Sequence, residues 1–261
     1  MILLDRVSKR YGTGSGAGPF VLQDVSLSLE RNRFVCLLGP SGCGKTTLLN
    51  LVAGFLAPSA GRVLVDGVGV SGPGPDRGVV FQDATLFPWM TVLDNVRFGL
   101  RQQGIAPEQA TAAAEECLAL VGMAAHAGEW PVRLSGGMRQ RVAIARILAL
   151  QPKVMLFDEP FSALDANSRE RLQAELLRIC AARPATVIYI THSVEEAAFL
   201  AERVIVVGPA PASIHADIAL PAPRPRARNS QECNEIKSLL RARLDALPCC
   251  ITPCPSGGCS P

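Results

Sequence analysis

The chain lacks an uncharged apolar run near the roughly 18–20 residues that a membrane-spanning helix needs, and it lacks a strong excess of charge. Its 26 Lys and Arg against 23 Asp and Glu give a net charge of +3, too small to indicate nucleic acid or acidic lipid as a partner. The N-terminus reads Met1-Ile2-Leu3-Leu4 and then meets Asp5 and Arg6, so the apolar region of a secretory signal is missing. We therefore expect the protein to act from the cytoplasmic side.

The nine cysteines do not indicate a disulfide framework, because their number is odd and a chain of 261 residues can bury its own core. Four of them crowd a tail rich in Pro, Ser and Gly: Cys249, Cys250, Cys254 and Cys259. These thiols could hold Zn²⁺ or respond to redox state. Adjacent cysteines chelate one tetrahedral ion poorly, however, so residues 246–261 are predicted to form a flexible, dispensable tail.

Apolar runs alternate with helical segments along most of the chain. The runs expected to be buried strands are Phe34–Leu38, Gly78–Phe81, Val154–Phe157 and Thr186–Ile190. Helices are expected between them, the first from about Lys45 to Ala53. This alternation predicts an α/β fold with a parallel sheet, and the helical stretch between Phe87 and Gln151 is then an insertion.

One glycine-rich segment follows the first of these strands and precedes a helix: Gly39-Pro40-Ser41-Gly42-Cys43-Gly44-Lys45-Thr46. Its spacing matches the GxxxxGK[ST] phosphate-binding loop. Glycines let successive backbone N–H groups approach a phosphate, and the helix N-terminus adds positive potential. Lys45 would charge-pair with the β- and γ-phosphates, and Thr46 would offer its hydroxyl to Mg²⁺. We predict nucleotide contacts from all eight residues and from Thr47.

Two acids, Asp158 and Glu159, end the strand that begins at Val154. In doubly wound folds, ligands bind at the carboxyl ends of the parallel strands. Asp158 would reach Mg²⁺ through a water, and Glu159 would polarise the attacking water. A solvated loop could also hold two acids, but the phosphate loop earlier in the chain favours a catalytic pair.

A second candidate anion site begins another helix: Leu134-Ser135-Gly136-Gly137-Met138. Ser135 can cap this helix, and the exposed N–H groups of its first turn attract an anion. A simple helix cap is the alternative interpretation.

Together these motifs resemble the nucleotide-binding subunits of ABC transporters, over roughly residues 1–245. The Leu-Ser-Gly-Gly-Met signature is close to unique to that family, whereas many NTPases share the other two motifs. The resemblance implies an α/β P-loop NTPase fold of ABC type: a mostly parallel core sheet, an N-terminal antiparallel β subdomain, and an α-helical subdomain inserted at about residues 88–152. It also implies ATP, Mg²⁺ and a head-to-tail homodimer, in which the signature of one subunit closes on the γ-phosphate held by the other.

The resemblance assigns roles to five further residues. Tyr11 would stack on adenine, although it could be an ordinary tyrosine at a strand end. Gln82 would contact Mg²⁺ and the lytic water, or it could be only a polar strand end. Ser162 and Asp165 lie in a loop that passes information between the two sites, and Asp165 could also cap a helix. His192 would hydrogen-bond the γ-phosphate and orient the water, although a histidine after a strand is usually structural.

A helix is expected to begin directly after His192. Ser193 and Glu196 have the spacing of a capping box, in which the serine caps the glutamate's N–H and the glutamate caps the serine's. This places the histidine at the junction of a strand and a helix.

Two segments resemble the importers for nitrate, sulfonates and taurine: Leu86–Val96 and Leu220–Arg226. The Phe and Trp of the first would be exposed and suit a groove for a partner's helix, or they could instead pack under the helical insert. Importers for pyrimidine precursors share such features. The resemblance implies an ATPase that energises solute uptake through separate transmembrane permease subunits, peripheral at the cytoplasmic face of the inner membrane. A periplasmic or lipid-anchored solute-binding protein would take part indirectly. The alternatives are a soluble non-transport ABC ATPase and a nucleotide-binding scaffold without turnover. The sequence does not identify the transported solute, because an ATPase subunit of this kind never contacts it.

Overall fold

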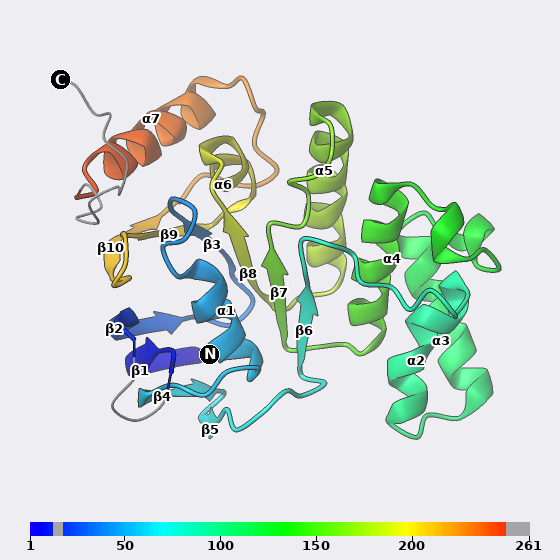
Figure 1. The fold of residues 1–261 in the computed structure, drawn as a ribbon. Coiled ribbons are helices and arrows are strands. Elements are labelled where there is room, and N and C mark those ends of the chain that lie inside the picture. Colours follow the sequence, from blue (N-terminus) through cyan, green and yellow to red (C-terminus); the bar gives the residue numbers. More distant parts are fainter. Residues whose placement is uncertain (13–17, 249–261) are drawn as a thin grey trace, which may run out of the picture.

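Two β-sheets and a block of helices make up the fold (Figure 1). The computed structural model describes residues 1–12 and 18–248. Helix α1 (Lys45–Ala53) contacts strands of both sheets, and it begins at the predicted phosphate loop. Both sheets therefore support that loop.

The core sheet has six strands in the order β10-β9-β3-β8-β7-β6. Every neighbouring pair is parallel except β10 with β9. The prediction of a mostly parallel sheet is confirmed, whereas β9 and β10 are strands that we did not predict. The strands are β3 (Phe34–Leu38), β6 (Arg77–Val80), β7 (Val154–Asp158), β8 (Thr186–Thr191), β9 (Arg203–Val207) and β10 (Ile214–Ala219).

The second sheet is antiparallel throughout and is formed by the N-terminal part of the chain. Its order is β2-β1-β4-β5, with β1 (Ile2–Arg10), β2 (Phe20–Leu29), β4 (Ala60–Val65) and β5 (Val68–Gly69). Asp66 and Gly67 join β4 to β5 with φ angles of 52° and 83°. Two consecutive positive φ angles define the tight hairpin turn that an Asp-Gly pair favours.

The helical block lies at the right of Figure 1. It contains α2 (Val92–Gln102), α3 (Pro107–Leu120), the 3₁₀ turns η2 (Ala124–His126) and η3 (Pro131–Arg133), and α4 (Gly136–Ala149). Thr91 caps α2, Pro107 occupies the first turn of α3, and Ser135 caps α4. Helix α4 contacts β6 and so joins the block to the core sheet.

The two faces of the core sheet have different covers. On β3, the side chains of Phe34, Cys36 and Leu38 belong to an apolar cluster that includes the helical block, α5 (Ala166–Ala182), α6 (Val194–Leu200) and α7 (Gln231–Asp245). Val35 and Leu37 belong to a second cluster with α1 and the antiparallel sheet. Such alternation is the period of a strand, and burial of both faces explains the unbroken apolar sequence of β3.

None of the helices in the described part of the chain is both long and apolar enough to cross a membrane. Residues 1–12 and 18–248 also hold no group of three or more His, Cys, Asp or Glu side chains arranged to bind a metal. The four tail cysteines from Cys249 onward lie outside the described residues.

Candidate active site

The phosphate loop connects the carboxyl end of β3 to α1, and glycine is required at two of its positions. At Gly39 a Cβ atom would lie 2.5 Å from the carbonyl oxygen of Val207 on β9. Gly44 is the N-cap of α1 and has a φ of 98°, a left-handed conformation that strains other residues. The loop can therefore pack against β9 and turn into the helix only with these glycines.

Lys45 is buried and folds back over this loop. Its Nζ atom donates to the carbonyl oxygens of Gly39, at 2.9 Å, and Pro40, at 2.7 Å. Pro40, Ser41 and Gly42 are exposed. The Lys45 ammonium is thus held at the loop where phosphates are predicted to bind.

Cys43 differs from its neighbours because its thiol is buried, 2% exposed, at 3.7 Å from the Lys45 Nζ atom. Burial raises the pKa of this thiol, although the nearby Lys45 charge opposes the rise. We therefore predict that Cys43 contacts a nucleotide through its backbone.

Thr46 and Asp158 meet where α1 begins and β7 ends. The Thr46 hydroxyl donates to Asp158 Oδ1 at 3.2 Å. Burial raises the pKa of the Asp158 carboxyl, the neighbouring Glu159 charge raises it further, and the Thr46 hydrogen bond and the Lys45 charge oppose the rise. The raised pKa means that the ionised form of Asp158 is disfavoured unless a positive charge lies nearby. A hydroxyl oxygen and a carboxylate at this position fit Mg²⁺, which is positively charged and prefers oxygen ligands.

Glu159 and His192 form the second contact of the candidate site. Nδ1 of His192 lies 3.0 Å from Oε2 of Glu159, and since an ionised carboxylate only accepts, Nδ1 carries the proton in this contact. Glu159 has a φ of 44° although it is not glycine, and its N–H donates to the carbonyl oxygen of Ile190. Ser162 Oγ donates to the Glu159 carbonyl oxygen at 3.0 Å. The pair is therefore held at the ends of β7 and β8, where it can take a proton from a water and orient that water.

The predicted capping box after His192 is only half formed. Ser193 Oγ accepts from the N–H of Glu196, as expected. The Glu196 carboxylate does not return to the Ser193 N–H, because it is buried and accepts from three other side chains instead. The Ser193 N–H donates to Thr191 Oγ1.

Tyr11 lies beside the helix that follows the phosphate loop. Its hydroxyl is 3.2 Å from Thr47 Oγ1, and the residue is 49% exposed. A half-exposed ring at this position can offer one face to a base, and the stacking of Tyr11 on adenine stays a prediction.

Gln82 is exposed and follows β6, and two side chains that we did not predict hold its loop. Gln140 Nε2 donates to the carbonyl oxygen of Phe81 at 3.2 Å, and Arg146 Nη1 donates to that of Thr85 at 2.9 Å. Both belong to α4. Gln140 is only 3% exposed, and a polar residue on the apolar face of a helix is the one sequence signal that marks it.

The signature residues begin the same helix. Leu134 is buried, Ser135 and Gly136 are exposed, and Gly137 and Met138 are half-buried. Ser135 Oγ accepts from the Met138 N–H at 3.3 Å. Within the described residues the signature makes no hydrogen bond to the phosphate loop, and Figure 1 shows α4 and α1 apart, with β6 and β7 between them.

The predicted inter-site loop follows Glu159 directly. Asp165 caps α5 by accepting from the Ser168 N–H at 3.0 Å, and this hydrogen bond lowers the pKa of its carboxyl. Arg169 holds the loop by donating to three of its carbonyl oxygens, those of Phe161, Ser162 and Leu164. Sequence reasoning missed Arg169 because nothing distinguishes it from other arginines on a helix surface.

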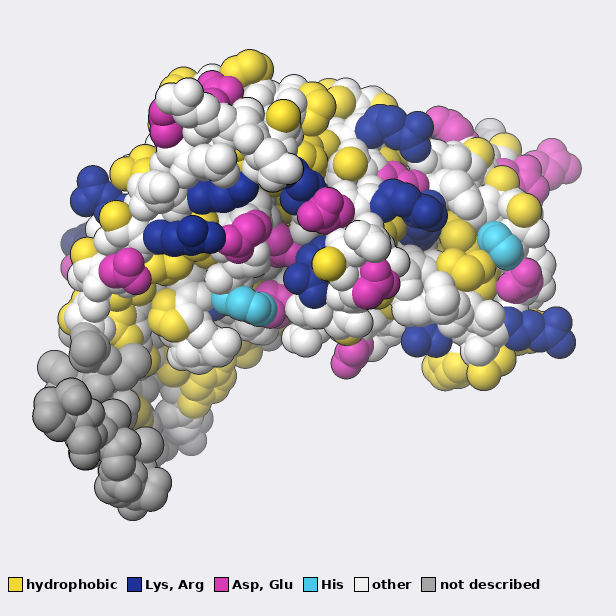
Figure 2. Space-filling model, turned by 90° about the horizontal axis from the view of Figure 1, so that it is seen from above, with side chains coloured by type: hydrophobic (Ala, Val, Ile, Leu, Met, Phe, Trp, Pro, Cys, Tyr) yellow, Lys and Arg dark blue, Asp and Glu magenta, His cyan; other side chains and the backbone are white. Residues whose placement is uncertain are grey.

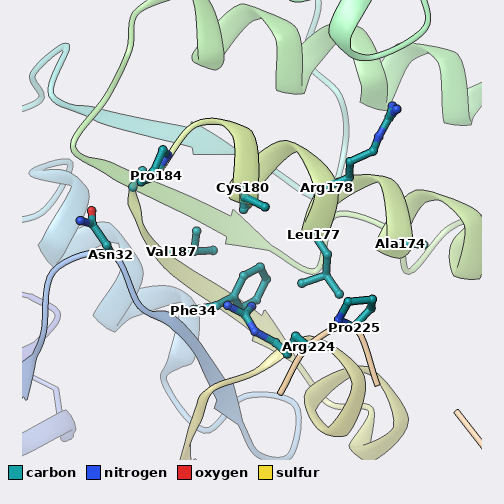
Figure 3. A pocket seen from close by; sticks show the side chains of 12 residues that line it. Asn32, Phe34, Ala174, Leu177, Arg178, Cys180, Pro184, Val187, Arg224 and Pro225 are labelled. Atoms are coloured by element: carbon teal, nitrogen blue, oxygen red, sulfur yellow. The ribbon is translucent and has the colours of Figure 1, made fainter. Parts of the chain in front are cut away.

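A cavity of about 530 Å³ lies elsewhere, at the N-terminal ends of β3 and β8 (Figure 3). Phe34, Leu177, Cys180 and Val187 line it, and none of the predicted site residues does. Nucleotides bind at the opposite, carboxyl ends of such strands, so this cavity is not the nucleotide site.

Figure 2 looks down on the edge where β6, β7 and β8 end, and there basic and acidic side chains are interspersed. The phosphate loop, the Thr46–Asp158 contact and the Glu159–His192 pair all belong to this edge. A phosphate loop between β3 and α1 of a mostly parallel sheet, with an acid pair at the end of β7, two strands away, defines a P-loop nucleoside triphosphatase.

Comparisons with known proteins specify the class further. A family model described as ABC transporter matches residues 22–162. The taurine import ATP-binding protein TauB of Pseudomonas fluorescens is 50% identical over 214 residues, which cover 82% of this chain and 80% of that protein. An uncharacterised ABC transporter ATP-binding protein of Methanocaldococcus jannaschii is 48% identical over 216 residues, which cover 83% and 81%. A dimeric ATP-binding cassette solved in a post-hydrolysis state with ADP and Pi superposes with a TM-score of 0.74 at 31% identity, covering 85% of this chain and all of that one.

The chain belongs to the ABC transporter family. It is one of the family's ATP-binding, ATP-hydrolysing subunits, and the expected fold of that type is confirmed.

Proposed function

We propose that two copies of this chain bind two ATP molecules at a shared interface and energise solute import through a separate permease. The observation that carries the proposal is that the phosphate loop and the signature lie apart on one chain, on α1 and α4 (Figure 1). Each is half of an anion site, and a head-to-tail dimer joins the halves. The dimeric form of the similar solved cassette supports this arrangement.

In each proposed site, Lys45 and the loop amides of residues 39–47 bind the phosphates and Tyr11 stacks on adenine. From the other copy, Ser135, Gly136 and Gly137 contact the γ-phosphate. These contacts exist only in the closed dimer, so ATP favours closure and its hydrolysis favours opening.

Thr46, Asp158 and Gln82 would hold Mg²⁺, Asp158 through a water. The hydroxyl–carboxylate contact and the raised pKa of Asp158 support this assignment. Bound there, the ion would neutralise charge on the β- and γ-phosphates.

In the proposed reaction, a water oxygen attacks the γ-phosphorus and the bond to the β–γ bridging oxygen breaks. Glu159 accepts the proton of the water, and His192 keeps Glu159 and the water aligned. ADP leaves with the bridging oxygen, and phosphate is released. Ser162 and Asp165, next to Glu159, would carry the state of one site to the other.

The permease is proposed to dock at the loop after Gln82. Trp89 is 67% exposed, and Phe87 beside it packs against Phe98 with ring centroids 4.9 Å apart. Phe87 is half-buried, so Trp89 is the exposed aromatic side chain that this loop offers to a partner helix. The chain would then lie at the cytoplasmic face of the inner membrane, and a solute-binding protein would act indirectly, through the permease.

The proposed cargo is a small anion or an organosulfur or nitrogen solute, of the taurine, sulfonate or nitrate class. Several similar proteins of known name are taurine import ATP-binding proteins. A soluble ABC ATPase without a transport partner has no such support.

Deletion of the gene tests the proposal directly. We expect a deletion strain to lose growth on taurine, an alkanesulfonate or nitrate as sole sulfur or nitrogen source, and the wild-type gene to restore it. Purification of the tagged chain from membranes should recover a permease. Normal growth on all three solutes would contradict the cargo class, and recovery without any membrane protein would contradict the transport role.

A further inference from the structure

Glu196 is a buried carboxylate beside the candidate active site, and the proposed reaction does not use it. It is 7% exposed and accepts hydrogen bonds from Thr191 Oγ1 at 2.5 Å, Gln173 Nε2 at 2.8 Å and the Tyr189 hydroxyl at 3.3 Å. A carboxylate is stable away from water only when donors surround it. The positions of these three donors are therefore tied to Glu196.

One of the donors flanks His192. Thr191 Oγ1, which donates to Glu196, also accepts from the N–H of Ser193 at 3.0 Å. The Thr191 hydroxyl thus joins the residue before His192 to the residue after it. Because this hydroxyl donates to Glu196, the carboxylate fixes the orientation of the hydroxyl. Glu159, His192 and Glu196 line the same small cavity of about 50 Å³.

A second donor, Gln173 on α5, reaches outward to Arg228. The Gln173 side chain is 1% exposed, its Nε2 donates to Glu196, and its Oε1 accepts from Arg228 Nη2 at 2.7 Å. A guanidinium only donates, so it holds the amide oxygen toward itself and leaves the NH₂ group for Glu196. Arg228 thereby sets the orientation of the amide.

Arg228 ends a segment that we call the arginine strap, Leu220–Arg228. Its alternate residues Arg224, Arg226 and Arg228 all contact α6, the helix that begins after His192. Arg226 donates to the carbonyl oxygens of Ala198 and Ala201, Arg224 to that of Leu200, and the Arg228 guanidinium lies 3.7 Å from the centre of the Phe199 ring. Figure 3 shows Arg224 and Pro225 beside Phe34, so the strap crosses the N-terminal end of β3.

We propose that Arg228 is a positioning residue for ATP hydrolysis, which holds His192 in place through Gln173, Glu196 and Thr191. The proposal rests on the catalytic role proposed above for His192. If the strap only stabilised the fold, turnover would not depend on Arg228 in particular. The positioning role instead requires turnover to depend on the hydrogen bonds that run from Arg228 to Thr191.

Arg228→Met, compared with Arg241→Met, tests the proposal. Arg241 also comes from the C-terminal segment and contacts α6, but it pairs with the exposed Glu195 at 2.6 Å and does not reach Glu196. In the full-length chain we expect Arg228→Met to lower kcat about tenfold, with KM for ATP within about twofold, because it misplaces a catalytic group without removing a nucleotide contact. Arg241→Met should change both constants by less than about twofold. Equal effects of the two variants, or an effect on KM alone, would overturn the proposal.

Two further variants separate the hydrogen-bond relay from the packing of Arg228 on Phe199. Gln173→Leu keeps the volume but removes both hydrogen bonds, so it should lower kcat as Arg228→Met does, and the double variant should be no worse than either. Arg228→Lys keeps a charged donor and should recover activity to within about threefold of the wild type. Additive losses, or a lysine variant as poor as the methionine variant, would contradict the relay.

The position of His192 can also be followed by NMR, because the chain has only three histidines. Arg228→Met should shift the ring resonances of His192 and leave those of His126 and His215 unchanged. An unchanged His192 signal would refute the relay. Full turnover by His192→Ala would instead remove the catalytic role of His192, which distinguishes failure of that role from failure of the relay.

Discussion

Two residues of the candidate site have environments that oppose the stability of the fold. Glu159 adopts a φ of 44°, and such conformations cost about 1–3 kcal/mol in a residue other than glycine. Asp158 is half-buried beside Glu159, and its burial, followed by the charge of that second acid, raises the pKa of its carboxyl. Strain and charge repulsion at these two positions are consistent with selection for chemistry rather than for folding.

Glu159→Gln removes the proposed proton acceptor and keeps the shape of the side chain. We expect turnover to fall by at least about 100-fold, because a positioned general base contributes at least that much, while ATP affinity is retained and the closed dimer accumulates. Turnover assays and size-exclusion chromatography with ATP measure both effects. Glu108→Gln, an exposed substitution on α3, is the control. Undiminished multiple turnover would show that another group activates the water.

Asp158→Asn should stabilise the nucleotide-free chain while lowering Mg²⁺-dependent turnover. Because folding raises the pKa of Asp158, the folded chain binds this proton more tightly than the unfolded chain does. The free energy of unfolding of the wild type therefore falls as pH rises from the unfolded pKa, about 4, through the folded pKa. The variant does not lose this stability, because asparagine does not ionise. Urea unfolding across this range should show a gain at neutral pH that vanishes below about pH 4. A gain that is independent of pH would contradict the assignment.

Among the elements, α4 connects two parts of the candidate site. Its N-terminus carries the signature, and its Gln140 and Arg146 hold the loop of Gln82. A displacement of this helix therefore moves the signature and the Gln82 loop together. Binding of a permease at that loop would then change the position of the signature at the proposed dimer interface.

Substitutions of Ser135 separate its capping role from its proposed phosphate contact. Ser135→Ala should lower the free energy of unfolding by about 1 kcal/mol, because the cap to the Met138 N–H is lost. Ser135→Asp should keep that stability, since aspartate caps equally well, but should abolish turnover by repelling the partner's γ-phosphate. Chemical unfolding and ATPase assays compare the two. An active, stable aspartate variant would rule out the phosphate contact.

The sequence predicts elements well where local rules determine them. Ser135, Asp165 and Ser193 cap the helices as expected, and the apolar runs of β3, β7 and β8 are buried strands. Strand β10 was missed because its residues alternate between half-buried and exposed at the edge of the sheet. The role expected of Glu196, a cap on the Ser193 N–H, was wrong. Its hydrogen-bond partners come from β8 and α5, and only tertiary packing brings those elements close to it.

At the scale of the whole molecule, the proposed permease contact depends on Trp89, which is exposed in the loop beside the helical block. Trp89→Ala should reduce the amount of permease recovered with the tagged chain by at least about tenfold, as expected for a central aromatic anchor. Trp130→Ala, 44% exposed in the same block, is the matched control. Thermal unfolding of both variants verifies that they fold. Equal recovery with the two variants would place the contact elsewhere.

The position of β3 between β8 and β9 has a consequence for synthesis on the ribosome. The strand that carries the phosphate loop is made early, but both of its neighbours are made late, from residues 186–207. Until they emerge, β3 has no partner in the sheet, and Val207 is not there to support Gly39. In a nascent chain, the phosphate loop therefore lacks the strands that support it in the folded protein until residues 186–207 have emerged.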